Sequence, residues 1–578
     1  MRLARTLSSV AAATLLLPLL LSAQATPQDP RVGLRTGWQN AGEAISNLTL
    51  VSHREKPAGF FNPQALGDFG FLNADFAISG NRLFLGGFHG IQFWDITNPA
   101  NPVLTNTLAC PGGQGDVSVH RNLLFMSVEE ARGRVDCGPQ GVRDTASAER
   151  FMGVRIFDIS NPAQPRQVAA VQTCRGSHTH TLVTDPKDPS HVYIYVGGTA
   201  PVRNPAELAG CSGRGPEDPN TSYFRIEVIH VPLAAPQDAR VVNAPRIFAD
   251  SAGNVGGLWP GGRHGPNTQE TATTDQCHDL TAYSEIGLMA GACSGNGILL
   301  DISDPANPKR VAEVSDPNFA YWHSATFSND GSKVLYTDEW GGGVAPRCLA
   351  TDRKEWGANA IFERSGHSLR FASYYKLPAP QTRFENCVAH NGNLIPVPGR
   401  DIMVQAWYQG GISVFDFTDA ANPVEIAYFD RGPMDTTLVL SGYWSAYWHN
   451  GYIYATEIGR GLDVFALKPS QFLSENEIAA AKLVRTEVLN AQNQQRIVWP
   501  ASIVVARAYL DGLVRRDGLR RAWAAPIYAA LTRAERQTGN QRRATLAPVI
   551  TQLTADAGRT SDARRVRELI DVLRGLTR

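Results

Sequence analysis

A ten-residue pattern that occurs four times constrains the fold of this chain more than any other feature. It runs from Phe93 to Pro102 as FWDITNPANP and returns at 156–165, 299–308 and 414–423. Each copy is an apolar run ending in Asp, followed by an Asx-Pro corner and a second β-type run. Asp and Asn side chains accept hydrogen bonds from nearby backbone amides, and Pro fixes φ, so the pattern predicts a hairpin corner.

A second hairpin precedes these corners. Asp75 to Leu85 alternates around Ser79-Gly80-Asn81, and His323 to Tyr336 alternates around an Asn-Asp-Gly turn. One unit is therefore four antiparallel strands, the content of a propeller blade. Weaker copies at 228–231, 369–377 and 462–467 bring the count to seven units, with six or eight as alternatives.

The last unit lacks a fourth strand, whereas Ile45 to Val51 is a strand-like run without a partner near the N-terminus. Pairing the two would close the ring and remove both open sheet edges. We therefore predict an all-β, seven-bladed β-propeller over residues 40–467, in which an N-terminal strand closes the last blade.

The repeated corner resembles that of the LVIVD-repeat proteins, which are secreted propellers. The stretch from His278-Asp279-Leu280 through 297–308 to Thr337-Asp338-Glu339 is similar to the same family, and the resemblance covers roughly residues 40–467. It implies the propeller fold and says little about activity.

From Ser474 onward the composition changes to Ala, Leu, Arg and Glu, which predicts an α-helical domain of four or five helices over 474–578. Ser474 to Glu477 forms a capping box before the first helix, and Ser561-Asp562 begins the last one. These helices weakly resemble the FIMAH-type domain. Residues 501–578 carry 15 Arg, no Lys and seven acids, so either an anionic partner or ordinary solvated helix faces explain this charge.

The N-terminus predicts export. Arg2 and Arg5 precede the apolar run 10–21, and Ala23-Gln24-Ala25 is a cleavage signal, so residues 1–25 read as a signal peptide. We expect a secreted protein, periplasmic or extracellular, with no transmembrane segment. The 54 basic residues balance the 54 acidic ones, and this balance gives no reason to expect nucleic acid as a partner.

The eight cysteines predict four disulfides. Each cysteine precedes a first strand or follows a second strand of a blade, and these positions share one face of a propeller. Of 105 possible connectivities, pairing of sequence neighbours is the simplest: Cys110–Cys137, Cys174–Cys211, Cys277–Cys293 and Cys348–Cys387.

Several histidines and acids fall at the same face, at the starts of first strands or the ends of second strands. They are the candidate metal ligands His178, His180, His278, His323, Asp338, Glu339 and Glu457. Imidazole and carboxylate together suit one transition-metal ion, namely Zn, Cu, Fe or Mn. The alternative is a water-filled channel whose polar groups bond only to neighbouring turns.

Two functions follow from these alternatives. The first is a binding or scaffold module that holds a protein, polymer or small ligand on the cysteine-rich face. The second is a metal-dependent enzyme, similar to an oxidoreductase, at the axial His/carboxylate site. Fold alone does not separate them, and no catalytic motif such as G-x-S-x-G or H-E-x-x-H is present.

Overall fold

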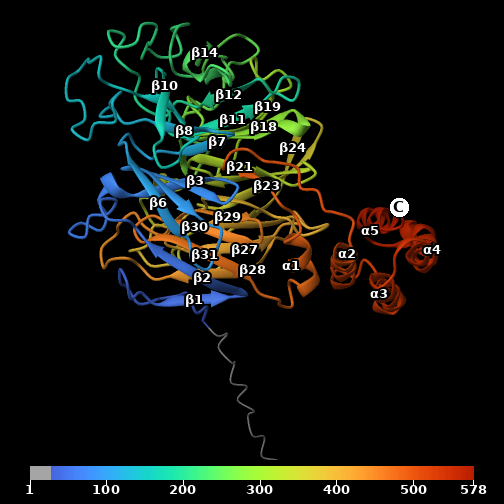
Figure 1. Cartoon of the computed structure of the whole chain (residues 1–578). Helices are drawn as coiled ribbons and strands as arrows, with labels where there is room; N and C mark the ends of the chain where they lie inside the picture. The colour runs from blue at the N-terminus through green and yellow to red at the C-terminus, as the bar shows by residue number, and fades with distance from the viewer. Residues whose placement is uncertain (1–27) are drawn as a thin grey trace, which may run out of the picture.

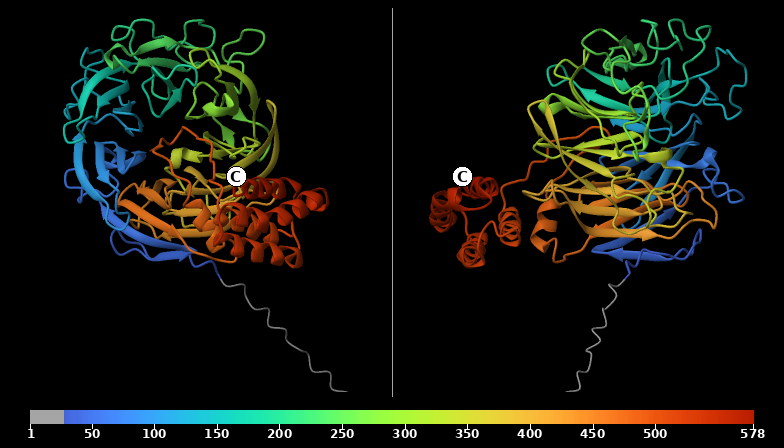
Figure 2. Two further views of the ribbon diagram at one scale, coloured as in Figure 1. Left: turned by 45° about the vertical axis from the view of Figure 1, so that its right-hand side comes forward. Right: turned by 180° about the vertical axis from the view of Figure 1, so that it is seen from behind.

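The structure is a computed structural model, and it describes residues 28–578. Its β-sheets stand in a ring, as Figure 2 shows in the left view, and we call the axis of this ring the channel. The C-terminal helices lie to one side of this ring (Figure 1). The predicted signal peptide lies outside the described residues. The chain is therefore a propeller-like β-structure with a C-terminal helical region.

Five sheets are built from four consecutive strands each. They are β3 (Asn73–Ser79), β4 (Arg82–Gly87), β5 (Gly90–Asp95) and β6 (Val103–Ala109); β7 (Val117–His120), β8 (Leu123–Val128), β9 (Gly153–Asp158) and β10 (Arg166–Gln172); β11 (His180–Thr184), β12 (His191–Val196), β13 (Glu227–Pro232) and β14 (Arg240–Asn243); β17 (Asp279–Tyr283), β18 (Leu288–Cys293), β19 (Asn296–Asp301) and β20 (Lys309–Val314); β21 (Trp322–Phe327), β22 (Lys333–Asp338), β23 (Asn359–Ser365) and β24 (Ser368–Tyr375). A short hairpin of β15 (Gly262–Arg263) and β16 (Glu270–Thr271) lies between the third and fourth sheets in the sequence.

The remaining long strands form one nine-stranded sheet. They are β1 (Glu43–Ser46), β2 (Leu48–Glu55), β25 (Asn391–Ile395), β26 (Ile402–Ala406), β27 (Ile412–Asp416), β28 (Val424–Arg431), β29 (Tyr443–His449), β30 (Tyr452–Glu457) and β31 (Gly461–Leu467). Within this sheet β25 pairs with β29 in parallel, whereas the other pairs are antiparallel. The first strands contact one another in a closed circuit of β3, β7, β11, β17, β21, β25, β29 and again β3. These strands line the channel.

The repeated corner forms as the sequence predicts. In each copy the Asp that ends the strand accepts a hydrogen bond from the backbone amide two residues further on. The four bonds run from Thr97, Ser160, Ser303 and Thr418 to Asp95, Asp158, Asp301 and Asp416, at 2.8–2.9 Å. The Asp therefore turns the chain at the end of the third strand of each unit.

The N-terminal segment pairs with strands from the far end of the β-region. Asn47 has a φ of 56° and divides the segment into two strands. β2 pairs antiparallel with β31, and β1 pairs antiparallel with β28 of the preceding unit. One segment therefore completes the last unit and also extends its neighbour.

Five α-helices follow the sheets. They are α1 (Glu475–Ala481), α2 (Ile503–Arg515), α3 (Arg521–Glu535), α4 (Gly539–Asp556) and α5 (Ala563–Gly575). The predicted capping box is present, since Ser474 and Glu477 each accept from the other's backbone amide. Buried Leu510, Leu531 and Leu569 belong to one shared apolar core. Within residues 28–578 no helix is long and apolar enough to cross a membrane.

Residues 486–497, which we call the strap, connect α1 to α2 and run around one mouth of the channel. Their short strand β32 (Val488–Leu489) pairs with β3. The strap and the following Trp499 form hydrogen bonds with residues in or directly after seven first strands. These residues are Asn450 after β29, Gly80 after β3, Val119 in β7, Leu182 in β11, Ala282 in β17, Phe327 in β21 and Pro396 after β25. The orange connection that crosses the ring in Figure 2 (left) includes this segment.

All four predicted disulfides are confirmed: Cys110–Cys137, Cys174–Cys211, Cys277–Cys293 and Cys348–Cys387. Each joins a cysteine that precedes a first strand to one at the end of the second strand or in the loop that follows it. Disulfides of this kind are typical of proteins in oxidising compartments.

Candidate metal centre at the channel mouth

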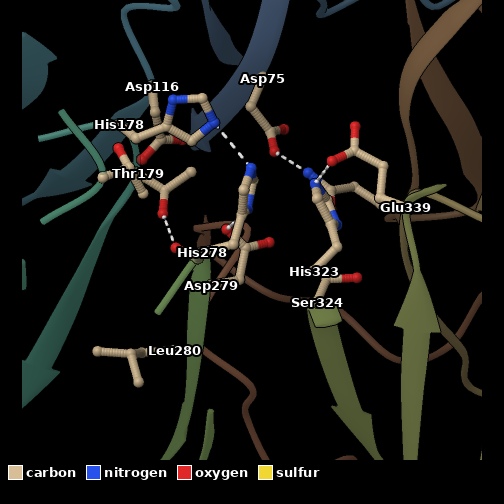
Figure 3. A network of polar contacts seen from close by, with 12 residues as sticks. Asp75, Asp116, His178, Thr179, His278, Asp279, Leu280, His323, Ser324 and Glu339 are labelled. Atoms are coloured by element: carbon tan, nitrogen blue, oxygen red, sulfur yellow. Dashed lines mark hydrogen bonds and ion pairs between the residues drawn. The ribbon is translucent and has the colours of Figure 1, made fainter. Parts of the chain in front are cut away.

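Four histidines and one glutamate meet at the channel mouth opposite the strap. We call His178, His278, His323, His390 and Glu339 the axial cluster. They come from the starts of four neighbouring first strands and from the end of β22. Figure 3 shows His178 and His278 facing each other, with His323 and Glu339 beyond them.

Carboxylates orient the first two imidazoles. His178 Nδ1 donates to Glu129 Oε2 at 2.5 Å, and His278 Nδ1 donates to Asp279 Oδ1 at 3.1 Å. Because a carboxylate accepts, each ring keeps its lone pair on Nε2 when it is neutral. These two Nε2 atoms lie 2.7 Å apart. A contact this short fits a hydrogen bond in which one ring donates an N–H to the lone pair of the other.

The other two imidazoles flank Glu339. His390 Nδ1 donates to the backbone carbonyl of Trp444, which leaves its Nε2 as the free acceptor. His390 Nε2 and His323 Nε2 each lie 3.7 Å from a different oxygen of Glu339. Neither nitrogen is exposed, and neither has a hydrogen-bond partner among residues 28–578. Buried polar atoms are normally paired, so these two require an explanation.

Distances within the cluster suit a metal ion. His323, Glu339 and His390 place one ligand atom each within 4.8 Å of one another, and so do His278, Asp279 and His323. The rings of His278 and His323 have centroids 3.8 Å apart, and those of His323 and His390 are 4.4 Å apart. An ion between His323, His390 and Glu339 would therefore have His278 as its next neighbour.

Burial determines the protonation of the ion-free cluster. It lowers the pKa of His390 to about 3 and holds the pKa of His278 and His323 well below the usual range. It also raises the pKa of Glu339 to about 8, against the hydrogen bond that Tyr408 donates. Burial lowers the pKa of His178, but the neighbouring Glu129 carboxylate has the larger effect, so the pKa of His178 is raised.

Three predicted ligands are placed elsewhere. His180 bonds through both ring nitrogens, to Ser118 at 2.6 Å and to Ser127 at 2.8 Å. Asp338 accepts the backbone amides of Ala320, Tyr321 and Gly357, and Glu457 pairs with Arg460 at 2.7 Å. These side chains secure neighbouring loops. β11 begins at His180, so His178 lies in the preceding loop and the two do not share one face of a strand.

His390 is the member of the axial cluster that sequence reasoning missed, although a signal for it exists. His278 directly follows Cys277, and His178 and His390 come shortly after Cys174 and Cys387. A histidine that follows a disulfide cysteine at the start of a first strand is thus a pattern within the chain. His390 fits it but was hidden because its strand, β25, carries a weak β-type sequence.

A pocket of about 250 Å³ opens beside the cluster, and His178, His278 and Glu339 form part of its lining. Trp444 also lines it. Trp322 and Trp407 are fully buried, and Trp448 lies beside the strap. Of these four tryptophans only Trp444 lines the pocket, together with Phe69, Phe88 and Tyr321.

Together, the ring of sheets and the axial cluster define a propeller with a polar centre at one channel mouth. The chain carries an LVIVD repeat, matched at residues 151–173, which confirms the resemblance to LVIVD-repeat proteins. The resemblance of the helices to a FIMAH-type domain stays a prediction.

Solved structures show distant similarity. The periplasmic gluconolactonase of Pseudomonas aeruginosa is 11% identical, with 74% of this chain and 99% of that chain covered at a TM-score of 0.40. Hydrazine synthase of Kuenenia stuttgartiensis is 12% identical, with 67% and 92% covered at a TM-score of 0.40. A search of curated proteins found no match. Similarity at this level transfers no activity.

Proposed function

We propose that the axial cluster binds one transition-metal ion through His323, His390 and Glu339, with His278 beside it, and that the protein is a metal-dependent enzyme. The observation that carries this proposal is the orientation of the imidazoles. Neighbouring acceptors hold the Nδ1 atoms of His278 and His390, so the Nε2 lone pairs of these two rings face the centre of the cluster. Hydrogen bonds of this kind orient metal-binding histidines in known sites.

The donor set supports Zn, Cu, Fe or Mn, since imidazole and carboxylate are ligands common to these ions. Three or four protein ligands leave a coordination position for water or substrate. The pocket beside Glu339 and His278 gives a substrate access to that position. An ion bound there would act as a Lewis acid or a redox centre. These features favour the enzyme over the binding module.

Several properties of the whole chain belong to the same proposal. The closed circuit of first strands supports seven blades, with β25 and β29 as the first strands of the last two. The bonds of the strap support a domain boundary after Val498, later than the boundary of 467 and 474 that the sequence predicts. We also propose that the mature protein is secreted, because four disulfides suit an oxidising compartment.

Elemental analysis of purified protein tests the metal site. We expect one transition-metal ion per chain in the wild type after extensive dialysis, and less than a tenth of that in a His323→Ala/His390→Ala variant. His367→Ala is the matched control, because His367 is exposed in the turn between β23 and β24. A wild type that neither contains nor tightly binds Zn, Cu, Fe or Mn would leave the binding module as the better account.

A further inference from the structure

The pocket beside the axial cluster has two walls of different chemistry. One wall is apolar, with Phe69, Phe88, Val344, Leu440 and Trp444. The other is polar and continues into the cluster through Gln114, Glu129, His178, His278, Tyr321 and Glu339. A volume of about 250 Å³ is at the small end for ligand pockets. The pocket is therefore sized for a small molecule with one apolar side and one polar side.

The apolar wall leaves hydrophobic surface uncovered. Phe69 is 52% exposed and Val344 is 49% exposed. Phe69 meets Phe88 edge to face, with ring centroids 6.2 Å apart. The two rings come from η1 (Phe69–Phe71) and from the turn after β4, and they stand at the rim of the pocket. Grouped apolar side chains at the rim of a polar site are typical of ligand contacts.

The polar wall contains no lysine or arginine among the described residues. Its most exposed ionisable groups, Glu129 and His178, pair with each other at 2.5 Å. A phosphate or carboxylate would thus meet no Arg or Lys, the residues with which proteins usually recognise such anions. An ammonium group would find Glu129 already paired.

We propose that this pocket binds an uncharged small molecule with an aromatic or other apolar body, whose polar end lies against His278 and Glu339. The assignment as a substrate rests on the proposed enzyme function, but binding to the apolar wall does not require the metal ion. Ring-to-ring contact with Phe88 would hold the body of the ligand.

Three molecules of nearly equal shape test the assignment: 2-phenylethanol, 2-phenylethylamine and phenylacetate. Binding is measured by calorimetry on the full chain, first after metal removal by chelation and then after reloading. We expect 2-phenylethanol to bind at one site on both forms, at least about tenfold tighter than either charged probe. The metal-free titration separates the two proposals, because elemental analysis alone decides the metal centre.

Two variants locate the binding. Phe88→Ala and Leu440→Ala should each weaken 2-phenylethanol binding by about fivefold or more, because each removes part of the apolar wall. Phe371→Ala is the control, since Phe371 is 41% exposed on β24 away from the pocket. No binding of 2-phenylethanol, equal or tighter binding of either charged probe, or indifference to both wall variants would each overturn the proposal. Phenylacetate that binds only the metal-loaded form would overturn the uncharged class and leave the metal centre standing.

Discussion

The two mouths of the central channel differ in what occupies them. At one mouth the strap bonds to blade after blade with backbone and amide side-chain groups. Asn490 alone bonds both the amide and the carbonyl of Val119, at 2.7 and 3.0 Å. At the other mouth His323 and His390 keep buried nitrogens without partners. The strap supplies hydrogen-bond partners across one mouth, where Trp448 Nε1 is a buried atom without a partner among residues 28–578. At the other mouth two unpaired imidazole nitrogens lie beside the same carboxylate.

This difference separates structural from functional polar groups. Both ends of the channel contain buried polar atoms, and burial of an unpaired polar atom costs about 1–3 kcal/mol. At the strap end the backbone and amide groups of the chain pair with one another. At the cluster end the Nε2 atoms of His323 and His390, each 3.7 Å from Glu339, have no hydrogen-bond partner among residues 28–578. Unpaired atoms are tolerated where a ligand completes them, and this contrast makes the axial cluster the candidate site.

Removal of the strap should have the largest effect. A chain that ends at Arg485, just before the strap, should aggregate or melt far below the full-length protein, whereas a chain that ends at Val498 should stay folded. At about 0.5–1.5 kcal/mol for each net hydrogen bond, loss of the strap removes more than ~5 kcal/mol. Such a loss is comparable to the whole stability of a typical domain.

Thermal melting of the two truncated chains, with circular dichroism as the probe, checks this. Equal melting temperatures for the two would show that the strap does not stabilise the fold. That result would contradict the structural role assigned to the polar groups at the strap mouth.

Addition of the metal ion should have the next largest effect on the stability of the folded protein. A free ion concentration about 100-fold above the Kd stabilises the folded state by about 2.7 kcal/mol. The wild type should therefore melt roughly 3 °C higher with the ion than without it. The His323→Ala/His390→Ala variant should show no shift, and His367→Ala should shift like the wild type. An equal shift in all three proteins would place the ion elsewhere.

Replacement of a single side chain in the strap should lower the stability of the protein the least. Asn490→Ala leaves the amide and carbonyl of Val119 unpaired and should lower the free energy of unfolding by about 1–3 kcal/mol. Gln495 lies in the same segment but is exposed, so Gln495→Ala should change it by less than about 0.5 kcal/mol. Denaturant titration compares them. The metal content of both variants should match that of the wild type.

Local chemistry explains what could be predicted from the sequence. The corners that end at Asp95, Asp158, Asp301 and Asp416 repeat because each Asp bonds to the amide two residues on, and such bonds are readable from residue type and spacing. The disulfides could be paired because strand direction fixes which loops share a face. Closure by the N-terminal segment followed from the strand that the last unit lacks.

The strap and the exact ligand set could not be predicted in this way. The strap has no regular periodicity, and its Asn and Gln side chains bond to backbone in blades far away in the sequence. His180 and His390 show the same difficulty. His180 starts a strand but turns to Ser118 and Ser127, whereas His390 precedes a weak strand and reaches Glu339. Which way a side chain turns depends on neighbours that the sequence does not place.

Anomalous X-ray diffraction from crystals of the metal-loaded protein, recorded on both sides of the absorption edge of the ion, tests the central claim most directly. The account predicts one strong peak in the channel, within coordination distance of His323 Nε2, His390 Nε2 and a carboxylate oxygen of Glu339. A peak bound by other residues, or a channel mouth without a peak at saturating ion, would contradict it.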